Sequence, residues 1–271
     1  MNNVKDVGDS VLGFITEALK ALVFDVQAFS QLSWRACLNV FSRPLYMRDI
    51  LFHMDRIGVS SVFIIVLTGF FTGAVLGIQS ENALRRYGAV SLTGQLVALT
   101  LVRELGPVLT ALMVAGRIGS GIAAELGSMV VTEQISALRA LGTDPIRKLV
   151  TPRMVATVTM LPLLTIICNF MGILGGWMVA AYKLNISSRQ YWADVINTLE
   201  FSDVFGSLAK PLVFGFIISM VACYVGLRTE GGTEGVGRST TQSVVSSSIL
   251  SLAADFFLNT LLIHLGGSLN L

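Results

Sequence analysis

The stretch "LVRELGPVLTALMVAGRIGSG", Leu101–Gly121, is apolar enough for a lipid bilayer, yet it carries a cation and an anion side by side. Arg103 and Glu104 stand just before Gly106-Pro107, and Arg117 follows near the end of the stretch. Neighbouring residues on a helix point about 100° apart, so Arg103 and Glu104 cannot face one another. A charge inside a bilayer costs a few kcal/mol unless it is paired or faces water. We therefore expect each of the two to have another partner or to line a wet cavity.

The proline adds a second polar group at the same place. Pro107 has no N–H, so the carbonyl of Arg103 loses its usual helical partner, and the helix should kink. Irregular backbone at membrane depth is tolerated only against protein or a cavity. Thr100 lies one turn earlier, on the side shared by the two charges. Two interpretations stay open: a polar spot that lines a substrate pathway, or a structural ion network between subunits.

The composition indicates a membrane protein. Of 271 residues, 53% are hydrophobic and 13% are charged, whereas soluble domains carry roughly 25% charged residues. A spanning helix needs about 20 mostly apolar residues. Five stretches qualify, which predicts an all-α integral membrane protein: 59–78, 92–116, 154–182, 211–227 and 243–265. We expect residues 1–58 to form an N-terminal region, 59–265 the transmembrane domain and 266–271 a short tail.

The distribution of Lys and Arg predicts the orientation. With the N-terminus inside, the inner segments hold thirteen Lys and Arg residues and the outer segments hold four. Cytoplasmic loops carry an excess of these residues. We therefore expect a cytoplasmic N-terminus and a C-terminus on the outer side.

An amphipathic helix is expected before the first span, over 11–43. Its apolar residues recur at helical spacing: Leu12, Ile15, Leu19, Leu22, Val26 and Phe29. Such a helix is typical of the membrane interface. Packing against another subunit is the alternative.

A short helix is expected between the second and third spans, on the cytoplasmic side. Val131, Ile135, Leu138 and Leu141 mark one apolar face, Gly142 is a natural C-cap, and Asp144-Pro145 starts a new helix. This face can hold a cytoplasmic partner, or it can lie on lipid. The candidate coupling residues are Glu133, Ile135, Leu138, Leu141 and Arg147.

Three further polar residues are assigned structural contacts inside the bundle: Asp255, Arg117 and Glu125. Asp255 lies near the middle of the last span and should face protein rather than lipid. Serines stand one and two turns before it, at Ser251 and Ser247, and we expect a hydrogen bond with them.

Catalytic and metal motifs do not appear in the sequence. It contains no HExxH, GxSxG or paired-aspartate pattern, its two histidines are isolated and its three cysteines form no CxxC. "GTEGVGRS", 232–239, imitates a phosphate loop without the required α/β context, and we expect a flexible cytoplasmic turn there. The chain is therefore expected to be no enzyme and to hold no metal or cofactor. An ion- or proton-coupled transporter that uses Arg103, Glu104 and Asp255 stays an alternative, as does a scaffold that transports nothing.

The block from Leu101 to Arg153 resembles the MlaE (YrbE) family of ABC-transporter permeases, the membrane subunits of MCE-type lipid transporters. The likeness continues in "LPLLT" at 161–165, "GGW" at 175–177 and "LAADF" at 252–256.

The resemblance implies a homodimer in the bacterial inner membrane that moves glycerophospholipid between the inner and outer membranes and so maintains outer-membrane lipid asymmetry. It also implies an ATP-binding cytoplasmic ATPase on the short coupling helix, a hexameric MCE protein on the periplasmic side, an accompanying STAS-domain protein and no nucleic acid. Residues near the lipid would be Arg103, Glu104 and Lys210, and we add Thr100 to this substrate-binding set.

Overall fold

The structure, a computed structural model, describes residues 2–40, 42 and 46–269, with the side chains of 17, 20, 23–40, 42, 46–81, 83–262 and 264. Every regular element in this part of the chain is a helix. Five helical segments are long and apolar enough to cross a membrane: Met47–Arg85, Val90–Val131, Ile146–Tyr182, Phe201–Leu227 and Gly232–Leu262. The predicted class, an all-α integral membrane protein, is confirmed.

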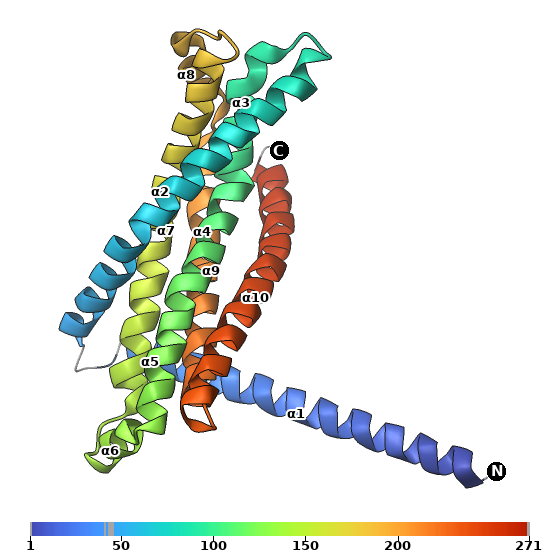
Figure 1. Ribbon diagram of the computed structural model, residues 1–271, viewed down its shortest axis with the longest axis vertical. Helices are drawn as coiled ribbons and strands as arrows, with labels where there is room; N and C mark the ends of the chain where they lie inside the picture. The colour runs from blue at the N-terminus through green and yellow to red at the C-terminus, as the bar shows by residue number, and fades with distance from the viewer. Residues whose placement is uncertain (1, 41, 43–45, 270–271) are drawn as a thin grey trace.

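The long helices form one bundle with a short helix at each end (Figure 1). The helix α6 (Gln134–Ala140) lies at one end and α8 (Ser188–Thr198) at the other, and the two ends are called the α6 end and the α8 end below. The spanning helices are α2 (Met47–Arg85), a segmented second span, η4 (Ile146–Val150) with α7 (Thr151–Tyr182), α9 (Phe201–Leu227) and α10 (Gly232–Leu269). They extend beyond the apolar stretches because helical hydrogen bonding continues into polar residues outside the lipid.

The second span is a continuous helical rod with two π-helical turns. It begins with η1 (Val90–Leu92) and runs through α3 (Thr93–Thr100), η2 (Leu101–Leu105), α4 (Gly106–Val114), η3 (Ala115–Gly119) and α5 (Ser120–Val131). The turns η2 and η3 are π-helical. The disturbance expected at Pro107 thus takes the form of a π-turn directly before it, and Pro107 stands in the first turn of α4, where its missing N–H is harmless to that helix.

The helix α1 (Asn2–Val40) crosses the α6 end and extends away from the bundle (Figure 1). Its attachment uses Phe29, whose ring packs edge-on against Tyr224, and Asp25, which pairs with Arg228. The hydrogen bond from Arg228 holds the pKa of Asp25 below its usual value. On the other side Trp34 is exposed, as an interfacial helix requires. The side chains of Leu12, Ile15, Leu19 and Leu22, on which the amphipathic pattern rests, lie outside the described residues.

The turn before α10 is shorter than expected. Gly231 and Gly232 have φ of 89° and 66°, values that glycine adopts without strain. These two residues reverse the chain, so α10 begins at Gly232 and includes the "GTEGVGRS" segment. The expected flexible turn at 232–239 is therefore wrong: the segment is helical.

Glycines bring α2 and α7 into close contact. A Cβ atom at Gly73 would lie 1.8 Å from the carbonyl oxygen of Gly172, and one at Gly175 would lie 2.0 Å from the carbonyl oxygen of Phe70. Small residues permit this backbone approach in membranes, where packing rather than the hydrophobic effect holds helices together.

We predict that Gly73→Ala destabilises the protein by about 1–3 kcal/mol, because the new methyl group forces two backbones apart. Thermal unfolding in detergent measures the loss. Gly237→Ala is the matched control, since a Cβ at Gly237 meets no atom within 4 Å. Equal unfolding temperatures for the two variants would contradict the tight contact.

Candidate functional site

The centre of the candidate site is an ion pair between η2 and the start of α9. Nε and Nη2 of Arg103 donate to the two carboxylate oxygens of Asp203, at 2.7 and 3.1 Å. Asp203 also accepts the backbone N–H of Glu200 at 3.2 Å, as part of the capping box of α9. One buried carboxylate therefore fixes both the start of α9 and the direction of the Arg103 guanidinium.

Lys210 joins three helices at the same depth. Its side chain is 2% exposed, and Nζ lies 2.8 Å from the carbonyl oxygen of Arg103, 3.1 Å from Glu104 Oε2, 3.3 Å from Asp255 Oδ1 and 3.4 Å from Asn259 Oδ1. The carbonyl that Pro107 leaves without a helical donor is thus bound by an ammonium group. An ammonium has three donors, and protein oxygens surround this one.

The prediction that Arg103 and Glu104 have separate partners is confirmed. Arg103 pairs with Asp203 and Glu104 pairs with Lys210, and both partners lie on α9. The network contains two cations, Arg103 and Lys210, and three carboxylates, those of Glu104, Asp203 and Asp255. Arg103 is 51% exposed and Glu104 is 38% exposed. A ligand can therefore reach Arg103 and Glu104, whereas Lys210 holds them from inside the protein.

Two further residues were singled out in this region, Thr100 and Asp255, and the contacts of Asp255 differ from those expected. Thr100 is half-buried and forms no side-chain hydrogen bond within the described part of the chain. Asp255 pairs with Lys210 instead of the serines: Ser247 donates to the carbonyl of Ser243, and Ser251 has no partner among the described residues. A serine hydroxyl can satisfy itself on its own helix, so the spacing did not reveal the partner of the carboxylate.

Three participants were missed by the sequence reasoning. They are Asp203, Asn259 and Asn169. Asn259 follows Asp255 by four residues and so shares its helix face, a signal that was available. Asn169 donates to Ser207 at 2.9 Å, and its amide oxygen would lie 1.7 Å from a Cβ at Gly106. The glycine before Pro107 therefore makes room for a buried amide.

The short helix α6 turns its apolar face inward. Ile135 is buried and Leu138 is half-buried against the core, so the middle of the expected face packs on the bundle, whereas Val131 and Leu141 at its two ends are exposed. Leu141 is 80% exposed and Glu133 is exposed in a left-handed conformation (φ 59°). These two face outward.

Arg147, the last coupling candidate, lies in η4 and is half-buried. Its Nε and Nη2 atoms have no hydrogen-bond partner within the described part of the chain.

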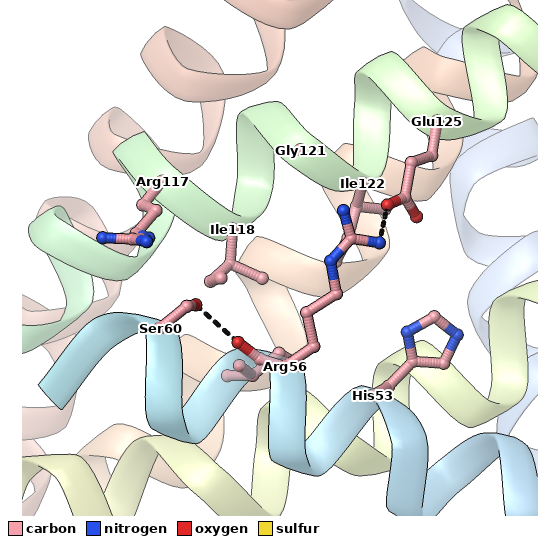
Figure 2. Close-up of a pocket in the computed structure, with 9 residues that line it drawn as sticks. His53, Arg56, Ser60, Arg117, Ile118, Gly121, Ile122 and Glu125 are labelled. Atoms are coloured by element: carbon pink, nitrogen blue, oxygen red, sulfur yellow. Dashed lines mark hydrogen bonds and ion pairs between the residues drawn. The ribbon is translucent and has the colours of Figure 1, made fainter.

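Arg117 and Glu125 stand on the second span, on its side toward α2 (Figure 2). Glu125 pairs with Arg56 of α2 and lies 3.1 Å from Nη2 of Arg153 on α7. It thus ties three spans together. Arg117 forms no ion pair with any residue that the structure describes, and it lines a cavity with Arg56.

We predict that Lys210→Met destabilises the protein by about 3–5 kcal/mol, because it leaves the half-buried Asp255 and the carbonyl of Arg103 without their cation. Glu104→Gln should cost about 1 kcal/mol or less, since the amide oxygen still accepts from Lys210 at a partly exposed position. Thermal unfolding of the purified protein compares them. A larger loss for Glu104→Gln would contradict the central position of Lys210.

Known proteins similar to this chain are permeases. The family model described as Permease MlaE matches residues 50–261. A probable ABC transporter permease protein of Rickettsia typhi is 44% identical over 88% of this chain and 92% of its own length. The intermembrane phospholipid transport system permease protein MlaE of Haemophilus influenzae is 38% identical over 79% of this chain and 82% of its own length. These likenesses cover most of the chain, and it belongs to the MlaE family of ABC transporter permeases.

Proposed function

We propose that this chain is the permease subunit of an ATP-driven transporter that moves glycerophospholipids between the inner and outer membranes and so maintains outer-membrane lipid asymmetry. The Haemophilus relative is named for intermembrane phospholipid transport. The observation that carries the proposal is the adjacent, partly exposed charges of Arg103 and Glu104 beside the helix break, in an otherwise apolar bundle. A phospholipid has an anionic phosphate and two apolar tails, which suits apolar walls with few charges.

The geometry divides the work among the charged residues. Asp203 occupies Nε and Nη2 of Arg103, which leaves further N–H groups of the exposed guanidinium for a phosphate oxygen. Glu104 accepts from Lys210 through Oε2 only. Its negative charge beside Arg103 weakens the hold on a phosphate, so that a bound lipid can leave. Lys210, whose side chain is 2% exposed, positions both groups from inside the protein.

The least buried spanning helix is α10, with 11% of its most apolar stretch buried. Phe256, Phe257 and Leu261 are exposed on it, in the region of Asp255 and Asn259. We propose that a second copy of the chain and the lipid tails cover this surface, so that a homodimer encloses the cavity.

The remaining parts of the assembly follow from the family. An ABC transporter permease works with a separate ATPase, which binds the ATP, and we place that subunit at the α6 end. The α8 end then faces the periplasm and a hexameric MCE protein, and a STAS-domain protein accompanies the ATPase. In this orientation the N-terminus is cytoplasmic and the chain lies in the inner membrane, as the excess of Lys and Arg indicates.

The first test is lipid transport by the reconstituted complex. We predict that Glu104→Gln and Arg103→Ala each lower ATP-dependent phospholipid transfer by about tenfold, the value of one charge-assisted contact, while the complex stays assembled. Photo-crosslinkers at Thr100 and Arg103 should capture lipid.

Other outcomes decide against the proposal. Capture of protein alone, with failed assembly of both variants, would make the pair a structural ion network. Transfer that follows a proton gradient without ATP would indicate the ion-coupled alternative. Normal binding of partners without any lipid would indicate a scaffold.

The second test concerns the ATPase. We predict that Leu141→Asp abolishes co-purification of the ATPase, because it places a carboxylate on the exposed apolar position of the α6 end. Ile196→Asp on α8 is the matched control, with an apolar side chain 70% exposed at the opposite end. Recovery of the ATPase with Leu141→Asp, in the same yield as with the control, would refute this docking surface.

A further inference from the structure

A cavity of about 200 Å³ lies between α2 and the second span, away from the Arg103 network (Figure 2). His53, Arg56 and Ser60 of α2 line one side, and Arg117 and Glu125 of the second span line the other. Three isoleucines complete the wall. The site thus combines charged groups from two spans with an apolar lining.

Positive charge exceeds negative charge at this cavity. Glu125 is shared between Arg56 and Arg153, so one carboxylate serves two cations. Arg117 extends from η3 toward Ser60 of α2 (Figure 2) and has no acidic partner within the described residues. The excess of positive charge at the cavity therefore favours an anion there.

The space beside Gly121 is open. A Cβ atom there would meet no atom within 4 Å, although Gly121 lines the cavity. The opening is wide enough for several waters at about 30 Å³ each, and so for one compact anionic group. The absence of a side chain at 121 keeps it accessible.

We propose that this cavity binds a phosphate group, supplied by an anionic phospholipid of the adjacent leaflet. Guanidinium groups bind phosphate through parallel N–H···O bonds. Arg117 lines the cavity on one side of Ile118, and Arg56, whose bond to Glu125 uses Nη1, lines it on the other (Figure 2). The apolar stretch 59–78 begins directly beside the cavity, which is the level of lipid headgroups. Basic pockets between spanning helices on the cytoplasmic side suit anionic headgroups. The assignment of the lipid to the cytoplasmic leaflet rests on the orientation proposed above. The binding of a phosphate group by the arginines does not depend on that orientation.

Occupation of the cavity would connect two spans. A phosphate held by Arg56 and Arg117 would tie α2 to the second span, which ends with α5 and is followed by α6. The lipid composition of the membrane would thereby act on the helix pair that ends beside the proposed ATPase surface.

Binding is tested with the purified full-length protein in detergent, by native mass spectrometry with phosphatidylglycerol and with phosphatidylcholine. Wild type should retain phosphatidylglycerol preferentially. Arg117→Gln should weaken this binding at least about tenfold, the loss of one charge-assisted contact. Gly121→Leu should do the same by filling the cavity without removing a charge. Thermal unfolding verifies that both variants are folded. If Gly121→Leu is not folded, Gly121→Ala, which has a smaller side chain, replaces it.

The matched control is Arg48→Gln, which removes an exposed cation from the same end of α2 outside the cavity. It should leave phosphatidylglycerol binding within about twofold. Equal weakening by Arg48→Gln and Arg117→Gln would overturn the site and leave only general attraction of the basic surface. Unchanged binding in folded Arg117→Gln and Gly121 variants would also overturn it.

Inorganic phosphate distinguishes the two sources of the ligand. If millimolar phosphate displaces phosphatidylglycerol from wild type but not from Arg117→Gln, the phosphate site is supported. If wild type binds phosphate but not phosphatidylglycerol, the ligand of the site is the free anion. Transport is measured separately. If lipid binding depends on Arg117 but the complex transports no lipid, the site stands and the proposed function is refuted. If the complex transports lipid but binding does not depend on Arg117, the site alone is refuted.

Discussion

The contact between Lys210 Nζ and the carbonyl oxygen of Arg103 holds the centre of this protein together. Pro107 removes the N–H that would bind this carbonyl inside a helix, and a bare carbonyl in hydrocarbon is costly. Lys210 supplies the donor, but a buried ammonium needs compensation of its own. Glu104 on the second span and Asp255 and Asn259 on α10 provide it. The break in the second span, the charges on α9 and the polar residues of α10 are therefore stable only as a set.

This set separates structural from accessible charge within one site. Lys210 is enclosed, whereas Arg103 and Glu104 reach the surface of the chain. The ion network lies inside a single chain, and two of its members remain exposed. The packing of α2 on α7 through glycines, with backbones in contact, gives a rigid wall beside it. A charged pair held by buried partners on rigid helices keeps its direction without a ligand.

The sequence predicted what depends on local chemistry. Apolar length predicted the spanning helices, the 100° step excluded an Arg103–Glu104 pair, and the missing N–H of Pro107 predicted a carbonyl in need of a donor. It did not predict which residues meet across the bundle. Arg103 and Asp203 are 100 positions apart, and their contact depends on the rotation and depth of two helices. The apolar stripe of α6 was predicted from its spacing, but not which of its residues pack on the bundle and which stay exposed, because one periodicity serves a core and a partner equally.

The basic residues at the α6 end illustrate how one composition serves two purposes. An excess of Lys and Arg on one side directs insertion, and that task needs no fixed side-chain geometry. Arg56, Arg117 and Arg153 belong to this excess in the proposed orientation. Arg56 and Arg153 share a single carboxylate, Glu125, and Arg117 lines the same cavity as Arg56. Once the helices pack, charges that directed insertion are brought near one another, where they repel unless an anion joins them. A pairing carboxylate satisfies part of that requirement, and the headgroup layer at the same depth is the nearest source of the remainder.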